Sequence, residues 1–236
     1  PRVAVREPLP SASRTLPLKL KQAPAPVVGI VSRAVPISHP DAAALECLTI
    51  ILGSGNSSRI HRVLVEEKRL ASYAEGGFYA LEQDGLIGFG AVLPPTASDL
   101  KPPIKALEAE IDRVIARGVS PAEVAKARNQ LLRDAVTSNL TVDSKASMLG
   151  HAATLEGGVD RVNRRYDRIR AVTQEDLRRV ARTYLAPDRR IRVEIERNLM
   201  GTLAASFPGA GKDPEEDAPI TAKPETEAPP PGKPGA

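Results

Sequence analysis

Two segments in which apolar residues alternate with period two, 73–81 and 85–93, limit the folds open to this chain more than any other stretch. The second segment places on one face Ile87, Phe89, Ala91 and Leu93. Such alternation indicates strands with one buried side, and the short connection through 82–85 is typical of a hairpin. The sequence therefore predicts an antiparallel sheet with one face against a core.

Three further segments predict strands. Leucines alternate with other residues at positions 16, 18 and 20, and the segment 27–31 is rich in β-branched residues. Near the end of the chain, Ile191, Val193 and Ile195 alternate with charged residues. We expect the apolar face of this last strand to be buried and the charged face to be wet.

Helical spacing of apolar residues fills most of the remaining chain. Helices are predicted over about 41–52, 57–69, 99–117, from 121 onward, and over 143–155, 160–171 and 173–185. Ser57 is the expected N-cap of the second helix, while Ser120 and Thr173 begin capping-box patterns. The fourth helix is expected to bury Val124, Leu131 and Leu132. The order of elements predicts an α+β domain in which helices pack on one face of a mainly antiparallel sheet.

Composition divides the chain into three parts. Residues 1–14 resemble a linker from a longer parent chain, 15–200 form the domain, and the Pro- and acid-rich residues 201–236 are expected to be a disordered tail. The 236 residues are 42% apolar and lack Trp, so one aliphatic core is expected. No apolar run is long enough for a membrane span. A signal peptide would lie upstream, which leaves the periplasm and the cytoplasm of a bacterium as the expected compartments.

The net charge of +4 is unevenly distributed. The tail from residue 201 carries three lysines and six acids, net −3, so the rest of the chain carries +7. This charge favours acidic partners. The Arg-rich segments 161–170 and 178–179 include Tyr166 as their one stacking aromatic and contain interspersed acids, which favours a solvated or protein-binding face over nucleic-acid binding.

No pattern in the sequence predicts a catalytic residue or a metal ligand. His39, His61 and His151 are far apart, and none belongs to an H-x-x-E-H or H-E-x-x-H motif. The glycine- and serine-rich segment 53–58 lacks a nucleophile elbow and a Gly-Lys-Ser/Thr ending, so it is interpreted as a turn between helices. The single cysteine, Cys47, lies in an apolar run and is expected to be a small core residue.

The segments 52–60 and 64–73 together resemble the helix–turn–helix–strand signature of the pitrilysin/insulinase and mitochondrial-processing-peptidase type of zinc peptidase. The similarity extends through the later helix starts to the closing strand, over about 15–197. The resemblance implies paired homologous domains that close over a peptide, one with zinc and one without it. It identifies this chain as the inactive C-terminal domain, with no cofactor of its own and zinc in the other half or partner.

The resemblance also bears on site residues. Domains of this kind carry an Arg and a Tyr that hold substrate and stabilise the oxyanion, but Glu66 stands at the Arg position here and Ser72 at the Tyr position. A carboxylate cannot donate to an oxyanion, so no catalytic pair is transferred to this chain. Tyr73, one position later, is a candidate substrate contact, although a tyrosine at the rim of a sheet is the more common structural role.

The helix predicted over 57–69 separates a core side from a polar side, and Arg59 and Arg62 on the polar side are candidates for a partner or chamber face. The predicted function is that of a non-catalytic half of a zinc metalloendopeptidase, inactive alone, with a homologous zinc-bearing domain or subunit as partner and peptides as substrate. One alternative is a structural or assembly subunit of the same fold. The other is a basic nucleic-acid-binding domain.

Overall fold

A single five-stranded sheet organises the computed structural model, which describes residues 12–20 and 23–197. The strands are β1 (Arg14–Lys19), β2 (Val27–Ala34), β3 (Tyr73–Ala80), β4 (Gly85–Val92) and β5 (Ile191–Glu196), in the spatial order β1-β5-β2-β4-β3. All neighbours pair antiparallel except β1 and β5, which are parallel. The predicted hairpin and the mainly antiparallel sheet are confirmed. The predicted tail over 201–236 and most of the predicted linker over 1–14 lie outside the described residues.

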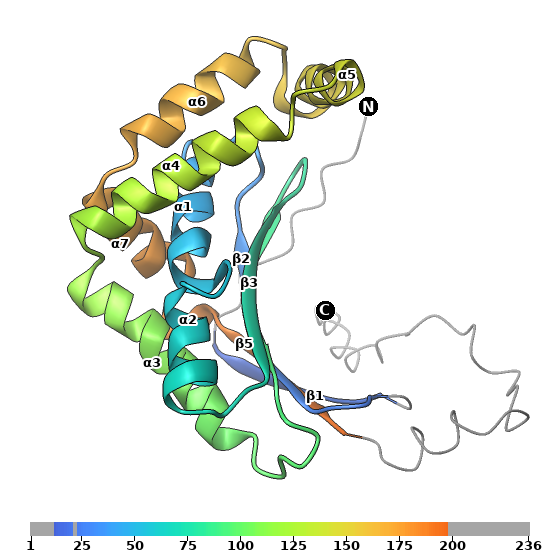
Figure 1. Ribbon diagram of the computed structural model, residues 1–236, viewed down its shortest axis with the longest axis vertical. Helices are drawn as coiled ribbons and strands as arrows, with labels where there is room; N and C mark the ends of the chain where they lie inside the picture. Colours follow the sequence, from blue (N-terminus) through green and yellow to red (C-terminus); the bar gives the residue numbers. More distant parts are fainter. Residues whose placement is uncertain (1–11, 21–22, 198–236) are drawn as a thin grey trace, which may run out of the picture.

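The helices lie on one face of this curved sheet, and its other, concave face carries no helix among the described residues (Figure 1). They are α1 (Ala42–Gly53), α2 (Arg59–His61), α3 (Lys101–Arg117), α4 (Pro121–Thr137), α5 (Val142–His151), α6 (Arg161–Ala171) and α7 (Gln174–Tyr184). The π-helical turns η1 (Arg62–Glu67) and η2 (Ala152–Glu156) continue α2 and α5, and a short 3-10 turn, η3 (Pro187–Arg189), precedes β5. The predicted α+β class is confirmed, because the helices form a layer against the sheet.

The core between the two layers is aliphatic. Its fully buried members include Ile30, Leu45, Leu48, Leu52, Ile87, Leu107 and Ile111, with Phe89 as the buried aromatic side chain among them. Each such side chain contributes about 1.5–3 kcal/mol through removal from water. Cys47 is also fully buried, and burial raises the pKa of its thiol to about 12, so it is an inert core residue as predicted.

The cap of α2 differs from the prediction. Ser58, rather than Ser57, accepts a hydrogen bond from the backbone N–H of His61, at 3.4 Å. The hydroxyl of Ser57 instead accepts a hydrogen bond from Lys126 of α4. The predicted continuous helix over 57–69 is a short α-helix followed by η1, whose Val63 and Leu64 are buried as expected.

Burial in α4 is less complete than predicted. Val124 is buried, but Leu131 and Leu132 are only partly buried. The helix packs mainly on α1 and α6, so its second half is covered on fewer sides than a helix that lies on the sheet.

The orientation of β5 is the opposite of the prediction. Arg192 pairs in register with the buried Ile30, and its guanidinium bonds to Glu108 of α3 at 2.6 Å, so the charged side of β5 faces the helices. Val193 pairs with Gly29 on the helix-free face. The registers of β1, β2 and β5 thus place on the helix-free face Leu16, Leu18, Val27, Val31, Val193 and Ile195. This face of the sheet is therefore apolar rather than wet.

Candidate functional site

A hollow of about 390 Å³ lies on the helix-free face, where β2, β3, β4 and β5 meet. Its lining includes four glycines that pair across the strands, Gly29 with Gly90 and Gly77 with Gly88. A Cβ added to Gly29 or Gly90 would meet its nearest atoms at 3.4 or 3.3 Å, so neither position is filled by a neighbouring side chain. At these two glycines the floor of the hollow is bare backbone that an extended ligand can approach closely, whereas the ring of Tyr79 lies over Gly77 and Val31 lies beside Gly88.

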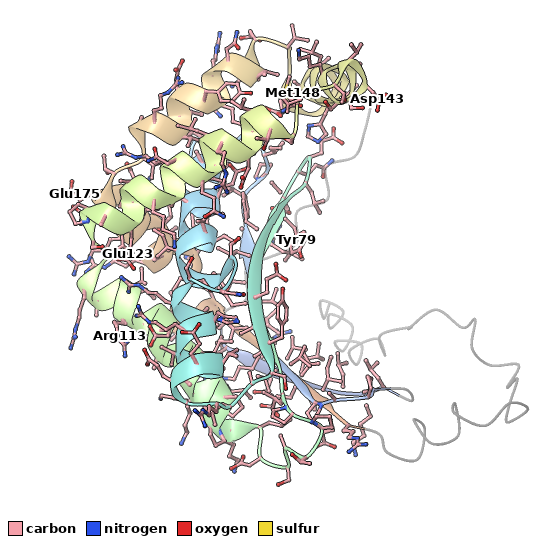
Figure 2. The ribbon with its side chains drawn as sticks, in the orientation of Figure 1. Tyr79, Arg113, Glu123, Asp143, Met148 and Glu175 are labelled. Atoms are coloured by element: carbon pink, nitrogen blue, oxygen red, sulfur yellow. The ribbon has the colours of Figure 1, made fainter. Side chains whose placement is uncertain are left out.

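Tyr73, Glu75 and Tyr79 line the β3 side of this face. With Gly77 they occupy every second position of β3 and so share one face, and Figure 2 shows Tyr79 on the helix-free side of β3. Tyr73 is 49% exposed and Tyr79 is 69% exposed. The hydroxyl of Tyr73 donates a hydrogen bond to Glu75 at 2.5 Å, and this bond raises the pKa of Tyr73. The predicted contact residue Tyr73 therefore lies on the open face, beside a carboxylate.

Arg59 makes a bidentate pair with Glu123, the third residue of α4. Its Nε and Nη2 donate to Oε1 and Oε2 of Glu123 at 2.7 and 2.8 Å. Glu123 also accepts hydrogen bonds from the backbone N–H and the hydroxyl of Ser120, which completes the predicted capping box. The hydrogen bond from Arg59 lowers the pKa of Glu123 to about 2, despite opposition from burial. Arg59 is thus bonded within the domain and its side chain is 15% exposed, and its role at a partner or chamber face stays a prediction.

Arg62 does lie on the surface. Its side chain is 56% exposed and pairs with Glu67 at 3.3 Å. Among the described residues no hydrogen bond or ion pair joins Arg59 or Arg62 to Tyr73, because α2 and η1 belong to the helix layer while Tyr73 faces the opposite side of the sheet. The three residues singled out from the sequence therefore do not form one site.

The histidines do not converge on a metal site. His39 precedes α1, His61 lies in α2 and His151 ends α5, and their nearest carboxylates are Asp41, Glu66 and Glu156 respectively. Within the described ranges no group of three or more His, Cys, Asp or Glu side chains could hold a metal ion. The described residues therefore do not fit a zinc centre.

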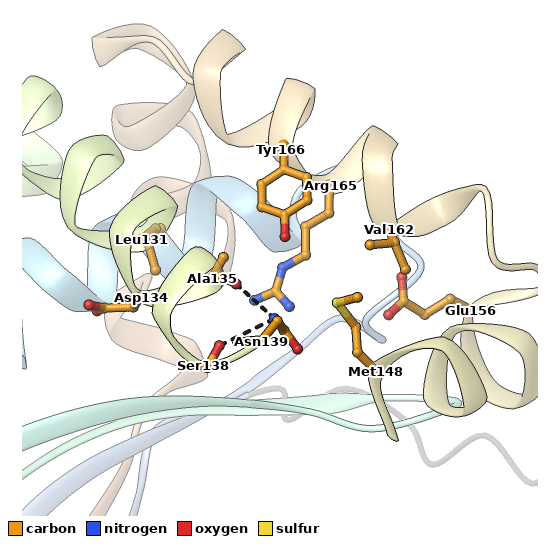
Figure 3. A pocket seen from close by; sticks show the side chains of 10 residues that line it. All are labelled: Leu131, Asp134, Ala135, Ser138, Asn139, Met148, Glu156, Val162, Arg165 and Tyr166. Carbon is orange, nitrogen blue, oxygen red and sulfur yellow. Dashed lines mark hydrogen bonds between the residues drawn. The ribbon is translucent and has the colours of Figure 1, made fainter. Parts of the chain in front are cut away.

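A second cavity, of about 240 Å³, lies among α4, α5 and α6 (Figure 3). Met148 and Arg165 are among its lining residues, and Arg165 bonds to Glu46 of α1 at 2.9 Å. Burial raises the pKa of Glu46, whose Oε2 has no hydrogen-bond partner. Sequence reasoning missed this cavity, because a separation of 119 residues between Arg165 and Glu46 leaves no local signal.

The arginines of α6 are largely paired with acids. Arg164 bonds to Asp160 at 2.7 Å and Arg170 to Asp167 at 3.2 Å, in addition to the pair between Arg165 and Glu46.

No helix in the described part of the chain is long and apolar enough to cross a membrane.

Comparison with known proteins gives a family. The profile of the "Peptidase M16 inactive domain" matches residues 1–131, more than half of the chain. None of the curated proteins searched matches the sequence.

Solved structures share the fold. A protease from Helicobacter pylori superposes with a TM-score of 0.76 at 21% identity, over 84% of this chain and 47% of that chain. The inactive peptidase domain of a candidate zinc protease from Bordetella parapertussis superposes with a TM-score of 0.66 at 25% identity, over 73% of this chain and 92% of that chain. A peptidase M16 inactive domain from Pseudomonas fluorescens superposes with a TM-score of 0.72 at 17% identity, over 83% of this chain and 47% of that chain. The chain spans about half the length of the first and third of these proteins.

Proposed function

Because the chain belongs to the peptidase M16 family, as an inactive domain, we propose that it forms the non-catalytic half of a substrate chamber in a zinc metallopeptidase and docks a homologous zinc-bearing half. The described residues supply neither metal ligands nor an activated nucleophile. Hydrolysis would then take place on the other half, and this chain would hold the peptide and close the chamber.

The observation that carries this proposal is the apolar, concave and helix-free face of the sheet. An antiparallel sheet that faces water on one side usually presents polar residues there. This sheet instead presents aliphatic side chains from β1, β2 and β5 around the glycine-floored hollow. Such a surface suits an extended peptide, whose apolar side chains need cover and whose backbone can approach the bare strands.

Tyr73 and Glu75 would orient that peptide at the β3 side of the hollow. The Tyr73 hydroxyl can turn from Glu75 to a peptide carbonyl, and the Glu75 carboxylate can accept hydrogen bonds from a peptide N–H or a basic side chain. Arg62 remains a candidate for the partner face because it is exposed. Arg59 is less accessible for that role, because it is bonded to Glu123 of α4.

Filling the hollow tests the proposal. The preparation combines this chain with the domain carrying H-x-x-E-H that is encoded in the same gene or beside it, and the assay follows cleavage of a fluorogenic peptide. Gly29→Leu should lower kcat/KM about tenfold or more, since it occupies the hollow without a backbone clash. Thr15→Leu is the control. Thr15 is an exposed residue of β1 that pairs with Arg192, so its side chain lies on the face of the sheet opposite the hollow, and this variant should leave turnover near wild type.

Equal turnover for both variants would show that the hollow does not bind the peptide substrate. A complex that assembles but hydrolyses no peptide would favour the structural role instead. The nucleic-acid alternative gains little from the structure, because three of the α6 arginines are bonded to acids of this chain.

A further inference from the structure

Helix α5 is unusual in this domain because none of its residues is buried. It has 10 residues, and its main packing partner is η2, the turn that continues it. A capping box between Thr141 and Ser144 fixes its start. With η2 the helical segment spans residues 142–156, and Ala152 is its buried residue, so α5 itself gains little stabilisation from the core of this domain.

The apolar stripe of α5 points away from the domain. Val142, Ala146 and Leu149 of α5, followed by Ala153 of η2, recur at the spacing of one helical face and are all exposed. The half-buried residues of α5 are Ser144 and Met148, and Met148 lines the cavity between α4 and α6 (Figures 2 and 3). The apolar stripe of a surface helix normally faces the core of its own domain, whereas the stripe of α5 faces outward.

The residues that flank α5 extend this apolar area. Val142 is 86% exposed, Leu140 70%, Val136 58%, Val159 54% and Leu149 42%. These five residues, here called the α5 surface, come from one continuous segment at the end of the domain where α4, α5 and α6 meet. Large exposed apolar side chains concentrated in one segment favour a protein-binding role for that segment.

Charge borders the α5 surface on one side. Helix α6, which begins two residues after Val159, has the sequence RVNRRYDRIRA, with five arginines and one acid. Arg161, at its first position, is half-buried and takes part in none of the ion pairs of the described residues. A partner suited to this surface has an apolar centre with acidic side chains at the edge that faces α6.

We propose that the α5 surface is where the zinc-bearing half docks, through an apolar helix with acidic residues beside it. This inference rests on the proposed function. The identity of the docked partner is argued from chain length. This chain spans 47% of the Helicobacter pylori protease and 47% of the Pseudomonas fluorescens chain, so each of those chains contains a second part of similar size. The helix-free sheet face then stays open to the peptide, while the α5 surface holds the two halves together.

The test measures binding of the separately purified zinc-bearing half to variants of this chain. Val142→Asp places an acid at the first position of α5, where the helix dipole favours it, so folding should be intact while the dissociation constant rises about tenfold or more. Arg161→Glu should weaken binding about three- to tenfold at low salt and less at high salt. If one gene encodes both halves, the variants are made in the whole protein, and the readout is amide hydrogen exchange of α5, which docking slows.

Leu86→Asp is the matched control, since Leu86 is an exposed apolar residue of β4 on the helix-free face. It should bind the zinc-bearing half normally and, if the proposed function holds, lower peptide turnover. Normal binding by Val142→Asp and Arg161→Glu in an active complex would overturn the α5 inference and leave the proposed function standing. Failure of the wild-type chain to bind would overturn both.

Two other occupants are outcomes that overturn the inference. A wild-type chain that is dimeric in sedimentation, with a monomeric Val142→Asp variant, would assign the surface to a second copy. Faster hydrogen exchange of α5 after removal of residues 201–236 would assign it to the acidic end of this same chain.

Discussion

At the scale of single residues, the side chain of Glu123 both caps one helix and pairs with a residue of another helix. Its carboxylate caps α4 through Ser120 and binds the guanidinium of Arg59 from α2. The side chains of Arg59 and Glu123 are 15% and 29% exposed, so water screens the pair only partly. Arg62, three residues later, has an exposed ion pair of the kind that contributes little to stability.

Arg59→Ala should therefore lower the free energy of unfolding by about 1–3 kcal/mol, because it removes two charge-assisted hydrogen bonds and leaves Glu123 without its cation. Arg62→Ala, the matched control, should change it by about 0–0.5 kcal/mol. Urea denaturation followed by circular dichroism measures both values. Equal effects of the two substitutions would show that the partly buried pair of Arg59 and Glu123 stabilises the fold no more than a surface pair does.

The same pair makes stability depend on pH. Binding of Arg59 lowers the pKa of Glu123 from 4.5 to about 2, so the folded state binds fewer protons than the unfolded state between these values. Stability from this group is complete above the unfolded pKa and is lost as pH falls toward 2. Wild type should exceed Glu123→Gln in unfolding free energy at pH 6, and the difference should shrink between pH 4.5 and pH 2. A difference that stays constant over this range would contradict the assignment.

At the scale of elements, polar clamps join helices that are distant in sequence. Asp41, just before α1, accepts hydrogen bonds from Arg179 and from the hydroxyl of Tyr184, both of α7 and both at 2.8 Å. Burial, followed by the hydrogen bond to Asp41, raises the pKa of Tyr184 to about 12. The clamp fixes α7 against α1, which carries much of the core.

Tyr184→Phe keeps the ring and removes the bond to a largely buried carboxylate. It should lower the free energy of unfolding by about 1–2 kcal/mol, measured by thermal or urea unfolding. Tyr79→Phe, which alters a 69% exposed tyrosine, should have almost no effect. If both substitutions were neutral, the clamp between α1 and α7 would not contribute to stability.

At the scale of the whole molecule, the two faces of the sheet differ in what covers them. Its helix-covered face holds the aliphatic core, and its other face offers an apolar, glycine-floored surface. The described residues contain no group of three or more side chains that could hold a metal ion. The family assignment and the half-length coverage of two solved proteins agree with a domain that works as one of two halves.

The isolated chain should neither bind stoichiometric zinc nor hydrolyse peptides, because its described residues offer no converging metal ligands and its sequence has no motif for an activated nucleophile. Metal analysis after dialysis against zinc, together with a casein assay, measures this. About one equivalent of zinc that is lost on substitution of His39, His61 or His151 would overturn the assignment as an inactive half.

The sequence by itself determined the features that depend on neighbouring residues. The hairpin of β3 and β4 and the capping boxes at Ser120 and Thr173 were predicted correctly, because turn chemistry, alternation and side-chain caps act over a few residues. The family resemblance carried by 52–73 was likewise confirmed by the profile match.

Only the tertiary structure decided which faces and partners those elements acquire. Alternation in β5 marks two faces but not which one meets the helices, and the bond from Arg192 to Glu108 turns its charged side inward. Arg59 meets Glu123 across 64 residues, and Asp41 meets Tyr184 across 143. The outward stripe of α5 follows the same principle, because periodicity gives a helix an apolar side, whereas long-range packing fixes the direction in which that side points.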